Sequence, residues 1–182
     1  MVYYIIGIVI ALLILTIILV YNKLIRNRNR MEEAWSIVDV YLKKRSDLVP
    51  NLVEIVKGYS AHERQLLEEV TRYRTDALRA GDTQAKVASE NGLTQALDKL
   101  YIIVEKYPDL KANQNYLKLQ QQLSEIENDL EKSRRYYNGT VRENNIYQES
   151  FPSNIIANLF GFTKGVFFAA DAAAKEVPTI AL

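Results

Sequence analysis

The residue types that most often do chemistry are sparse in this sequence, and the few present lack the spacing that catalysis requires. His62 is the single histidine among 182 residues, and it opens the segment HERQL. A zinc-protease helix needs a second histidine four residues after the first, where this chain has Leu66. A di-iron bundle needs Glu-x-x-His, and the residue three before His62 is Tyr59. We therefore expect no metal site here and interpret His62 as a surface residue at the start of a helix.

Composition excludes further classes of chemistry. The chain contains no cysteine, which rules out disulfides, thiol catalysis and zinc–thiolate sites. It has no Gly-rich phosphate loop and no Gly-x-Ser-x-Gly turn. The carboxylates between 125 and 131 fall on a helix face where charges usually serve only solubility. We expect a protein that is not an enzyme, with no catalytic residue, cofactor or metal, and its net charge of +1 gives no reason to expect nucleic acid as a partner.

Arg45 belongs to the first of two polar groups that need an explanation. It falls on the apolar stripe of an amphipathic pattern, where the other members are mostly large and apolar. Burying an unpaired guanidinium is prohibitive, so a carboxylate must lie beside it if the helix packs on this face. We expect a buried ion pair with Asp47 or Asp39 that fixes helix register, and we favour this structural role over a binding role.

The second polar group lies in the segments RRYYN at 134–138 and VRENN at 141–145. Tyr137 and Asn138 fall on the inner side of a predicted helix, where hydrogen-bonding groups need partners. We interpret them as a polar layer inside a helical bundle. A ligand-binding or signalling site in this layer, between Arg134 and Asn145, is the alternative function.

The elements that position these residues begin with a membrane span. From Val2 to Tyr21 no residue is charged, and the stretch holds seven Ile, four Leu and three Val. As a helix rising about 1.5 Å per residue, such a stretch extends roughly 30 Å, the thickness of a bilayer's hydrocarbon core. Tyr3, Tyr4 and Tyr21 bracket it, where aromatic rings favour the two interfaces. We expect a transmembrane anchor over 1–22, and a cleaved secretory signal is the less favoured alternative because the apolar stretch is long.

Four cations follow the span directly, namely Lys23, Arg26, Arg28 and Arg30. Such a cluster is typical of the cytoplasmic end of a membrane helix and of contact with anionic lipid headgroups. We therefore expect the N-terminus outside the cell and residues 22–182 in the cytoplasm.

The rest of the chain predicts an all-α protein in which the span continues into a long antiparallel four-helix bundle over 23–150. Apolar residues alternate at three and four positions from Met31 to Tyr59, and further amphipathic stretches follow at about 61–80, 84–106 and 112–149. Short connections favour antiparallel neighbours, and this spacing suits coiled-coil contacts.

Pro50 lies inside the first amphipathic pattern. Proline removes one backbone hydrogen bond and clashes with the preceding turn of a helix. We therefore expect a kink near 46–50, or a break with Ser46 or Asp47 capping the helix that follows.

Residues 151–182 form an apolar C-terminal segment without a long period. In an antiparallel bundle the fourth helix returns toward the membrane end of the first, which would deliver this segment to the bilayer. Its large apolar residues are Ile155, Ile156, Leu159, Phe160, Phe162, Phe167 and Phe168. We expect 151–170, with Phe160 and Phe162, to lie at the membrane interface or against a partner, and the equally weighted alternative is that it caps the bundle's own core.

Three segments resemble the LemA family of bacterial membrane proteins: EEAWSIVDVYLKKRSDLVPNLVEIVKGYSAHE at 32–63, YPDLKANQNYLKLQQQLSEIENDLEKSRRYYNGTVRENN at 107–145, and SFPSNIIANLFGF at 150–162. Departures are Tyr41, where the family commonly has Gln, and RENNIYQ at 142–148. The resemblance implies a single-pass anchor in the bacterial inner membrane, then an antiparallel helical bundle, with no established activity or cofactor. Some relatives are linked to magnetosome membranes, and the gene often neighbours that of a membrane metalloprotease.

The expected function is that of a non-enzymatic, membrane-anchored helical scaffold or adaptor. Confinement to a membrane raises the effective concentration of partners, so weak lateral contacts suffice for assembly. The expected partners are the lipid bilayer, further copies of the chain in a homo-oligomer, and another membrane protein such as a membrane metalloprotease.

Overall fold

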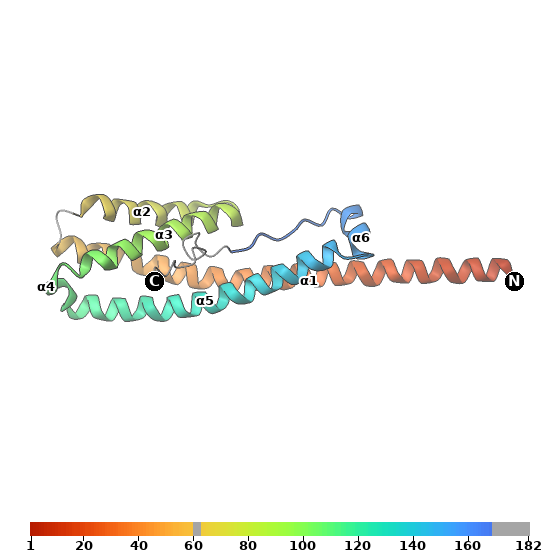
Figure 1. Cartoon of the computed structure of the whole chain (residues 1–182), viewed down its shortest axis with the longest axis horizontal. Coiled ribbons are helices and arrows are strands. Elements are labelled where there is room, and N and C mark those ends of the chain that lie inside the picture. Colours follow the sequence, from red (N-terminus) through yellow and green to blue (C-terminus); the bar gives the residue numbers. More distant parts are fainter. Residues whose placement is uncertain (60–62, 169–182) are drawn as a thin grey trace, which may run out of the picture. The chain divides into compact units, whose positions relative to one another are not determined.

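The computed structural model describes residues 1–59 and 63–168, and these contain helices and connections but no strand (Figure 1). His62 and residues 169–182 of the predicted C-terminal segment lie outside the described residues. The helices are α1 (Val2–Tyr59), α2 (Arg64–Arg79), α3 (Thr83–Val104), α4 (Pro108–Lys111), α5 (Gln114–Glu149) and α6 (Ser153–Leu159). The all-α prediction with a long apolar N-terminal helix is confirmed.

The predicted helix bounds agree closely with α1, α2, α3 and α5, whereas α6 was not expected. Side-chain caps explain two of the starts. The Asp82 carboxylate accepts a hydrogen bond from the Ala85 N–H at 2.8 Å, and the Asn113 side-chain oxygen accepts from Asn115 N–H at 2.9 Å. The antiparallel four-helix arrangement and the division at 1–22, 23–150 and 151–182 stay predictions.

The helices divide into two compact units, each described here by itself. Unit 1 comprises Met1–Val38 and Ser133–Phe167, and unit 2 comprises Asp39–Lys132 together with Phe168. Unit 2 has a continuous apolar core to which α1, α2, α3, α4 and α5 all contribute. Its most deeply buried side chains include Leu52, Val70, Leu93, Leu100, Leu110 and Leu123. Removal of these side chains from water supplies the main driving force for packing the helices of unit 2.

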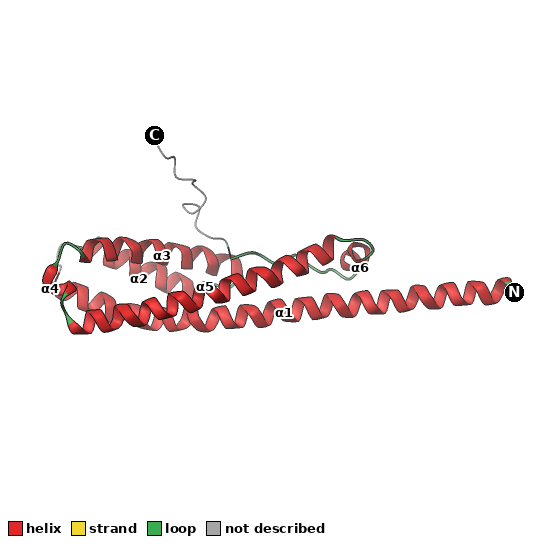
Figure 2. Cartoon of the chain, turned by 60° about the horizontal axis from the view of Figure 1, so that its bottom comes forward, coloured by secondary structure: helices red, strands yellow, loops and turns green. Residues whose placement is uncertain are grey.

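Within unit 2, α2 and α3 pack side by side (Figure 2). Gly92 of α3 permits this approach, because a Cβ at that position would lie 2.4 Å from the ring of Tyr73 on α2. The helix α3 runs through Gly92 without interruption. The missing side chain therefore contributes to packing between helices rather than to a turn.

Pro50 does not break α1, and the prediction of a break there is wrong. The helix runs continuously from Val2 to Tyr59 with Pro50 inside it. A proline at position 50 leaves the carbonyl of residue 46, one turn earlier, without its helical donor. Arg74 of α2 supplies the missing bond, since its Nε–H donates to the Ser46 carbonyl at 2.7 Å. The proline is thus tolerated because a neighbouring helix satisfies the buried carbonyl.

This arrangement predicts a coupling between Arg74 and Pro50. Arg74→Ala leaves the Ser46 carbonyl buried without a donor, and we expect a loss of about 1–3 kcal/mol in unfolding free energy. In a Pro50→Ala background the new backbone N–H supplies the donor, so the same substitution should cost much less. Urea unfolding of the four proteins of this double-mutant cycle, followed by circular dichroism in detergent micelles, measures the coupling. Equal costs of Arg74→Ala in both backgrounds would contradict the explanation.

In unit 1, α6 packs on α1 where the apolar span ends. Ile156 and Ala157 are buried against Val20 and Leu24 of α1. A glycine ends α6, because Gly161 adopts φ +69° and the Phe162 N–H donates to the Ala157 carbonyl at 2.9 Å. This is the Schellman geometry, and it turns the chain back along the unit.

Candidate functional site

The apolar span of unit 1 is uncovered over most of its length. Every side chain from Met1 to Thr16 is exposed, and the helix meets the length and hydropathy required of a membrane span. Tyr3 and Tyr4 are exposed near its start, and Tyr21 lies near its end. Since none of its most apolar 18-residue window is buried inside the protein, this window is not part of a core helix, and the chain has an N-terminal helix suited to anchoring in a membrane.

The cations after the span lie on exposed turns of α1. Arg28 is 3.7 Å from Glu32 and Arg30 is 3.9 Å from Glu143, and all four side chains in these pairs are at least half exposed. Ion pairs with this exposure contribute little to stability. Lys23 and Arg26 have no carboxylate partner among the described residues. The cluster is therefore available to groups outside the chain.

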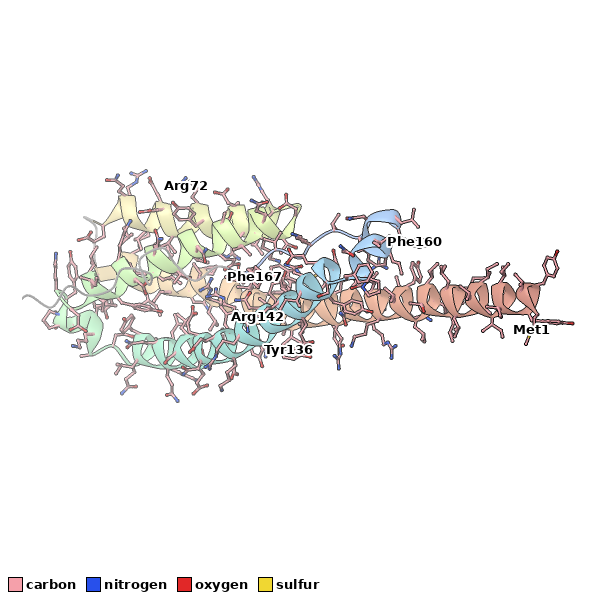
Figure 3. The ribbon with its side chains drawn as sticks, turned by 45° about the vertical axis from the view of Figure 1, so that its right-hand side comes forward. Met1, Arg72, Tyr136, Arg142, Phe160 and Phe167 are labelled. Carbon is pink, nitrogen blue, oxygen red and sulfur yellow. The ribbon has the colours of Figure 1, made fainter. Side chains whose placement is uncertain are left out.

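An aromatic group joins the end of the span to α6. The ring of Tyr21 meets Phe160 edge-on with centroids 4.9 Å apart, and it meets Phe162 at 5.8 Å. The guanidinium of Arg28 lies over the Phe162 ring, 5.8 Å from its centroid. Figure 3 shows Phe160, directly after α6, beside the part of α1 that continues to Met1. The structure thus brings together Tyr21, Arg28, Phe160 and Phe162 of the predicted membrane-interface set.

Residues 162–167, which we call the strap, run in extended form and are held by side chains of α5. The Asn145 side chain makes two hydrogen bonds to the backbone of Gly165. Its amide nitrogen donates to the Gly165 carbonyl at 3.0 Å, and its amide oxygen accepts from the Gly165 N–H at 2.8 Å. The Gln148 amide donates to the Thr163 carbonyl at 3.1 Å. The Tyr137 hydroxyl donates to the Val166 carbonyl at 2.7 Å, while its ring lies 5.2 Å from that of Trp35. Burial raises the pKa of Tyr137, so the phenol remains a neutral donor.

These contacts give the predicted polar layer its partners. Tyr137 is buried, Asn138 is half-buried, and Asn144 accepts from the Gln148 amide at 3.1 Å. The hydrogen-bonding groups of Tyr137, Asn145 and Gln148 are engaged by the chain's own backbone. A small ligand at this place would have to displace the strap, and the ligand-binding alternative stays a prediction without a specific observation in its favour.

Arg45 lies at the centre of unit 2 with no exposed surface. One terminal nitrogen donates to Glu127 at 2.8 Å and to the Thr94 hydroxyl at 2.9 Å, and the other binds the Glu90 carboxylate. Burial alone would lower the pKa of Arg45, but the carboxylates of Glu127 and Glu90 outweigh it, so the pKa is raised and the charge is kept. Desolvation and the nearby Glu127 carboxylate also raise the pKa of half-buried Tyr101, to about 12.

The partners of Arg45 differ from the expected ones. Asp47 is exposed and lies 3.8 Å from Lys43, and Asp39 pairs with Lys86. Both expected carboxylates lie within six residues of Arg45 on α1, whereas the actual partners come from α3 and α5. The sequence does contain a signal for Glu90, because it occupies the position before Leu93, Leu97 and Leu100 on the apolar stripe of α3. Glu127 has no comparable signal.

Unit 2 also has an open groove of about 960 Å³ between α1 and α2. Its floor includes Val53 and Leu67, and its rim carries both signs of charge, including an Arg64–Glu68 pair at 2.8 Å. Arg72, another rim residue, projects from α2 (Figure 3). Over residues 1–59 and 63–168 no group of three or more acidic, histidine or cysteine side chains is placed to hold a metal ion.

Comparison with known proteins gives one family. The profile of the LemA family matches residues 34–182. Protein LemA of Metamycoplasma hominis is 26% identical over 160 residues, which cover 87% of this chain and 73% of that protein. Magnetosome protein MamQ 2 of Paramagnetospirillum magneticum is 23% identical over 193 aligned positions, which cover 92% of this chain and 71% of that protein. Magnetosome protein MamQ of Magnetospirillum gryphiswaldense is 20% identical, and the alignment covers 85% of this chain and 66% of that protein. With its apolar N-terminal helix and helical units, and with a family match over most of its length, the chain belongs to the LemA family.

Proposed function

We propose that the chain is a non-enzymatic scaffold or adaptor, anchored in the bacterial inner membrane, that self-associates or binds another membrane protein. The N-terminus lies outside in this proposal and the helical units lie in the cytoplasm, because the cations at 23–30 follow the span. A membrane metalloprotease is one candidate partner. The MamQ relatives are named as magnetosome proteins. For this chain we propose membership of a larger membrane assembly.

The uncovered span is the observation that carries the proposal. Its side chains are all exposed from Met1 to Thr16, so this part of the helix is available to lipid or to other membrane helices. Gly7 has open space where a side chain would stand, and Ala11 follows one turn later. Association of membrane helices depends on close packing of backbones rather than on the hydrophobic effect, and small residues permit it. Confinement in the bilayer then makes weak contacts sufficient.

Crosslinking in the membrane tests the proposal. A photoreactive phenylalanine analogue is placed at Ile8 or Leu12 in the span, and at Thr71 or Arg72 on the groove of unit 2. After illumination of cells, crosslinked products are identified by mass spectrometry. We expect products containing a second copy of the chain or one recurrent membrane protein from at least one of the two surfaces.

Two results would contradict the proposal. The first is the absence of a protein crosslink from all four positions, together with a monodisperse monomer in native mass spectrometry from nanodiscs. The second is turnover of a metabolite by the purified full chain. Label at Gln120, an exposed position on α5 that belongs neither to the span nor to the lining of the groove, is the matched control for random collision.

A further inference from the structure

We propose that α6, with Phe151 before it and Phe160 after it, is a second attachment to the membrane that lies in the interfacial layer of the bilayer. The occupant is lipid, with acyl chains against the apolar side chains of α6 and phosphates at the cations of α1. This attachment is independent of the proposed function, because it requires neither a partner protein nor self-association.

The depth of α6 follows from its contacts with α1. An apolar helix of about 20 residues spans the hydrocarbon core, which places Tyr21 at the boundary of the bilayer when Tyr3 and Tyr4 lie at the other. Tyr21 is the residue whose ring contacts Phe160 and Phe162. Val20 and Leu24, on either side of it, hold Ile156 and Ala157 of α6. The helix is therefore fixed at the level of the headgroups.

The side of α6 that α1 does not cover is also apolar. Ile155 and Leu159 lie one turn apart and are 57% and 75% exposed, and the flanking Phe151 and Phe160 are 81% and 52% exposed. Ile156 and Ala157 account for the covered side. Four large apolar side chains exposed around one seven-residue helix form a patch that is costly in water, and such patches mark interaction sites.

An apolar cleft between α6 and the span identifies the occupant as lipid. The cleft measures about 200 Å³ and is lined by Ile17, Ile18, Tyr21 and Phe160. It opens at the same level as the end of the hydrocarbon core, and its lining is hydrocarbon and aromatic. A segment of acyl chain matches this lining, because apolar sites are filled by apolar groups when no polar partner is present.

The charges around the patch are complementary to anionic headgroups. Residues 150–163 contain no charged side chain, so no carboxylate of this stretch would be carried into the interface. Lys23 and Arg26 of α1 lack carboxylate partners among the described residues, and Arg28 lies over Phe162. Cations beside a membrane surface attract anionic phosphates, and aromatic rings favour the same layer. Binding of anionic lipid requires cations next to an uncharged apolar helix, whereas binding of a protein partner does not require this combination.

Spin labelling of the full chain tests the proposal, and the lack of cysteine makes single-label variants clean. Ile155→Cys and Leu159→Cys are labelled with a nitroxide and placed one copy per nanodisc containing anionic and zwitterionic lipid. Collision rates with oxygen, which concentrates in lipid, and with a polar nickel chelate, which stays in water, are then measured. Leu13→Cys is the control for lipid, and Tyr136→Cys is the matched control for water, since Tyr136 is 53% exposed on α5 (Figure 3).

We expect the ratio of oxygen to nickel collisions at 155 and 159 to exceed that at 136 by about tenfold, which corresponds to about 1.4 kcal/mol of difference between the two reagents in their transfer from water to lipid. A ratio equal to that at 136 would show that α6 faces water and would overturn the proposal. Low collision with both reagents would show that protein covers the patch, and this also overturns it. Circular dichroism and Trp35 emission equal to those of the cysteine-free chain establish that each variant is folded.

Discussion

Replacing Arg45 with methionine is expected to lower the unfolding free energy by about 3–5 kcal/mol, the largest effect of any single substitution we consider. The guanidinium is fully buried and is the cation that neutralises Glu90, whose side chain is itself only 2% exposed. Without it, the Glu90 carboxylate stays in the apolar core of unit 2 with no opposite charge. Removal of one partner of a buried pair costs far more than the pair contributes, because the other charge remains desolvated.

The loss should depend on pH in a defined direction. In the variant, burial makes the Glu90 carboxylate bind a proton more readily in the folded state than in the unfolded state. Folding of the variant then takes up a proton, so the variant gains stability as pH falls. The difference in unfolding free energy between parent and Arg45→Met should therefore shrink from pH 8 to pH 5. Urea unfolding followed by circular dichroism in detergent micelles measures both values.

Two controls make the Arg45 result specific. Arg45→Met combined with Glu90→Leu removes both charges and should recover most of the lost stability, since apolar replacement of a buried pair is often neutral. Lys43→Met removes an exposed cation of the same helix, 3.8 Å from Asp47, and should change stability by no more than about 0.5 kcal/mol. A loss below about 1 kcal/mol for Arg45→Met would contradict the interpretation.

Replacing Gly165 with valine is expected to release the strap from α5. A Cβ at this position would lie 2.3 Å from the Met31 sulfur and 3.3 Å from a methyl of Val141, and valine adds two further methyl groups. Overpacking of this kind costs about 1–3 kcal/mol. Release of the strap removes the acceptors of Tyr137 and Gln148 and both bonds of Asn145.

Trp35 reports on this release, because it is the single tryptophan of the chain and its ring lies 5.2 Å from Tyr137. We expect its emission to shift to longer wavelength and its quenching by acrylamide to increase. The pKa of Tyr137, which burial raises, should move back toward the ordinary value of about 10 when solvent reaches the phenol.

Gly139→Val is the matched control for the strap. Gly139 lies on α5 in the same unit, and a Cβ there would have no atom within 4 Å. We expect unchanged Trp35 emission and at most a small gain in stability, because glycine in a helix interior costs about 0.5–1 kcal/mol relative to alanine and valine recovers only part of this difference. Equal spectra for Gly165→Val and the parent would show that the strap does not depend on the close approach of Gly165.

Some of the structure follows from the sequence alone. The span is determined by composition, because twenty uncharged residues match the thickness of a bilayer whatever the rest of the chain does. The helices α1, α2, α3 and α5 follow from apolar spacing, which is a local property of each segment. The sequence also determined that Arg45 needed a carboxylate if buried, since the cost of an unpaired charge does not depend on the fold.

The tertiary structure alone decided which groups meet these needs. The carboxylates of Glu90 and Glu127 bind Arg45 from 45 and 82 residues away, and Arg74 satisfies the carbonyl that Pro50 leaves open from 28 residues away. The strap is likewise fixed by α5 side chains 15–29 residues earlier in the chain. Hydrogen-bond and charge requirements are set by each residue's chemistry, so the sequence shows that a partner must exist. The register in which helices pack selects the partner, and that register depends on all the contacts of the core at once.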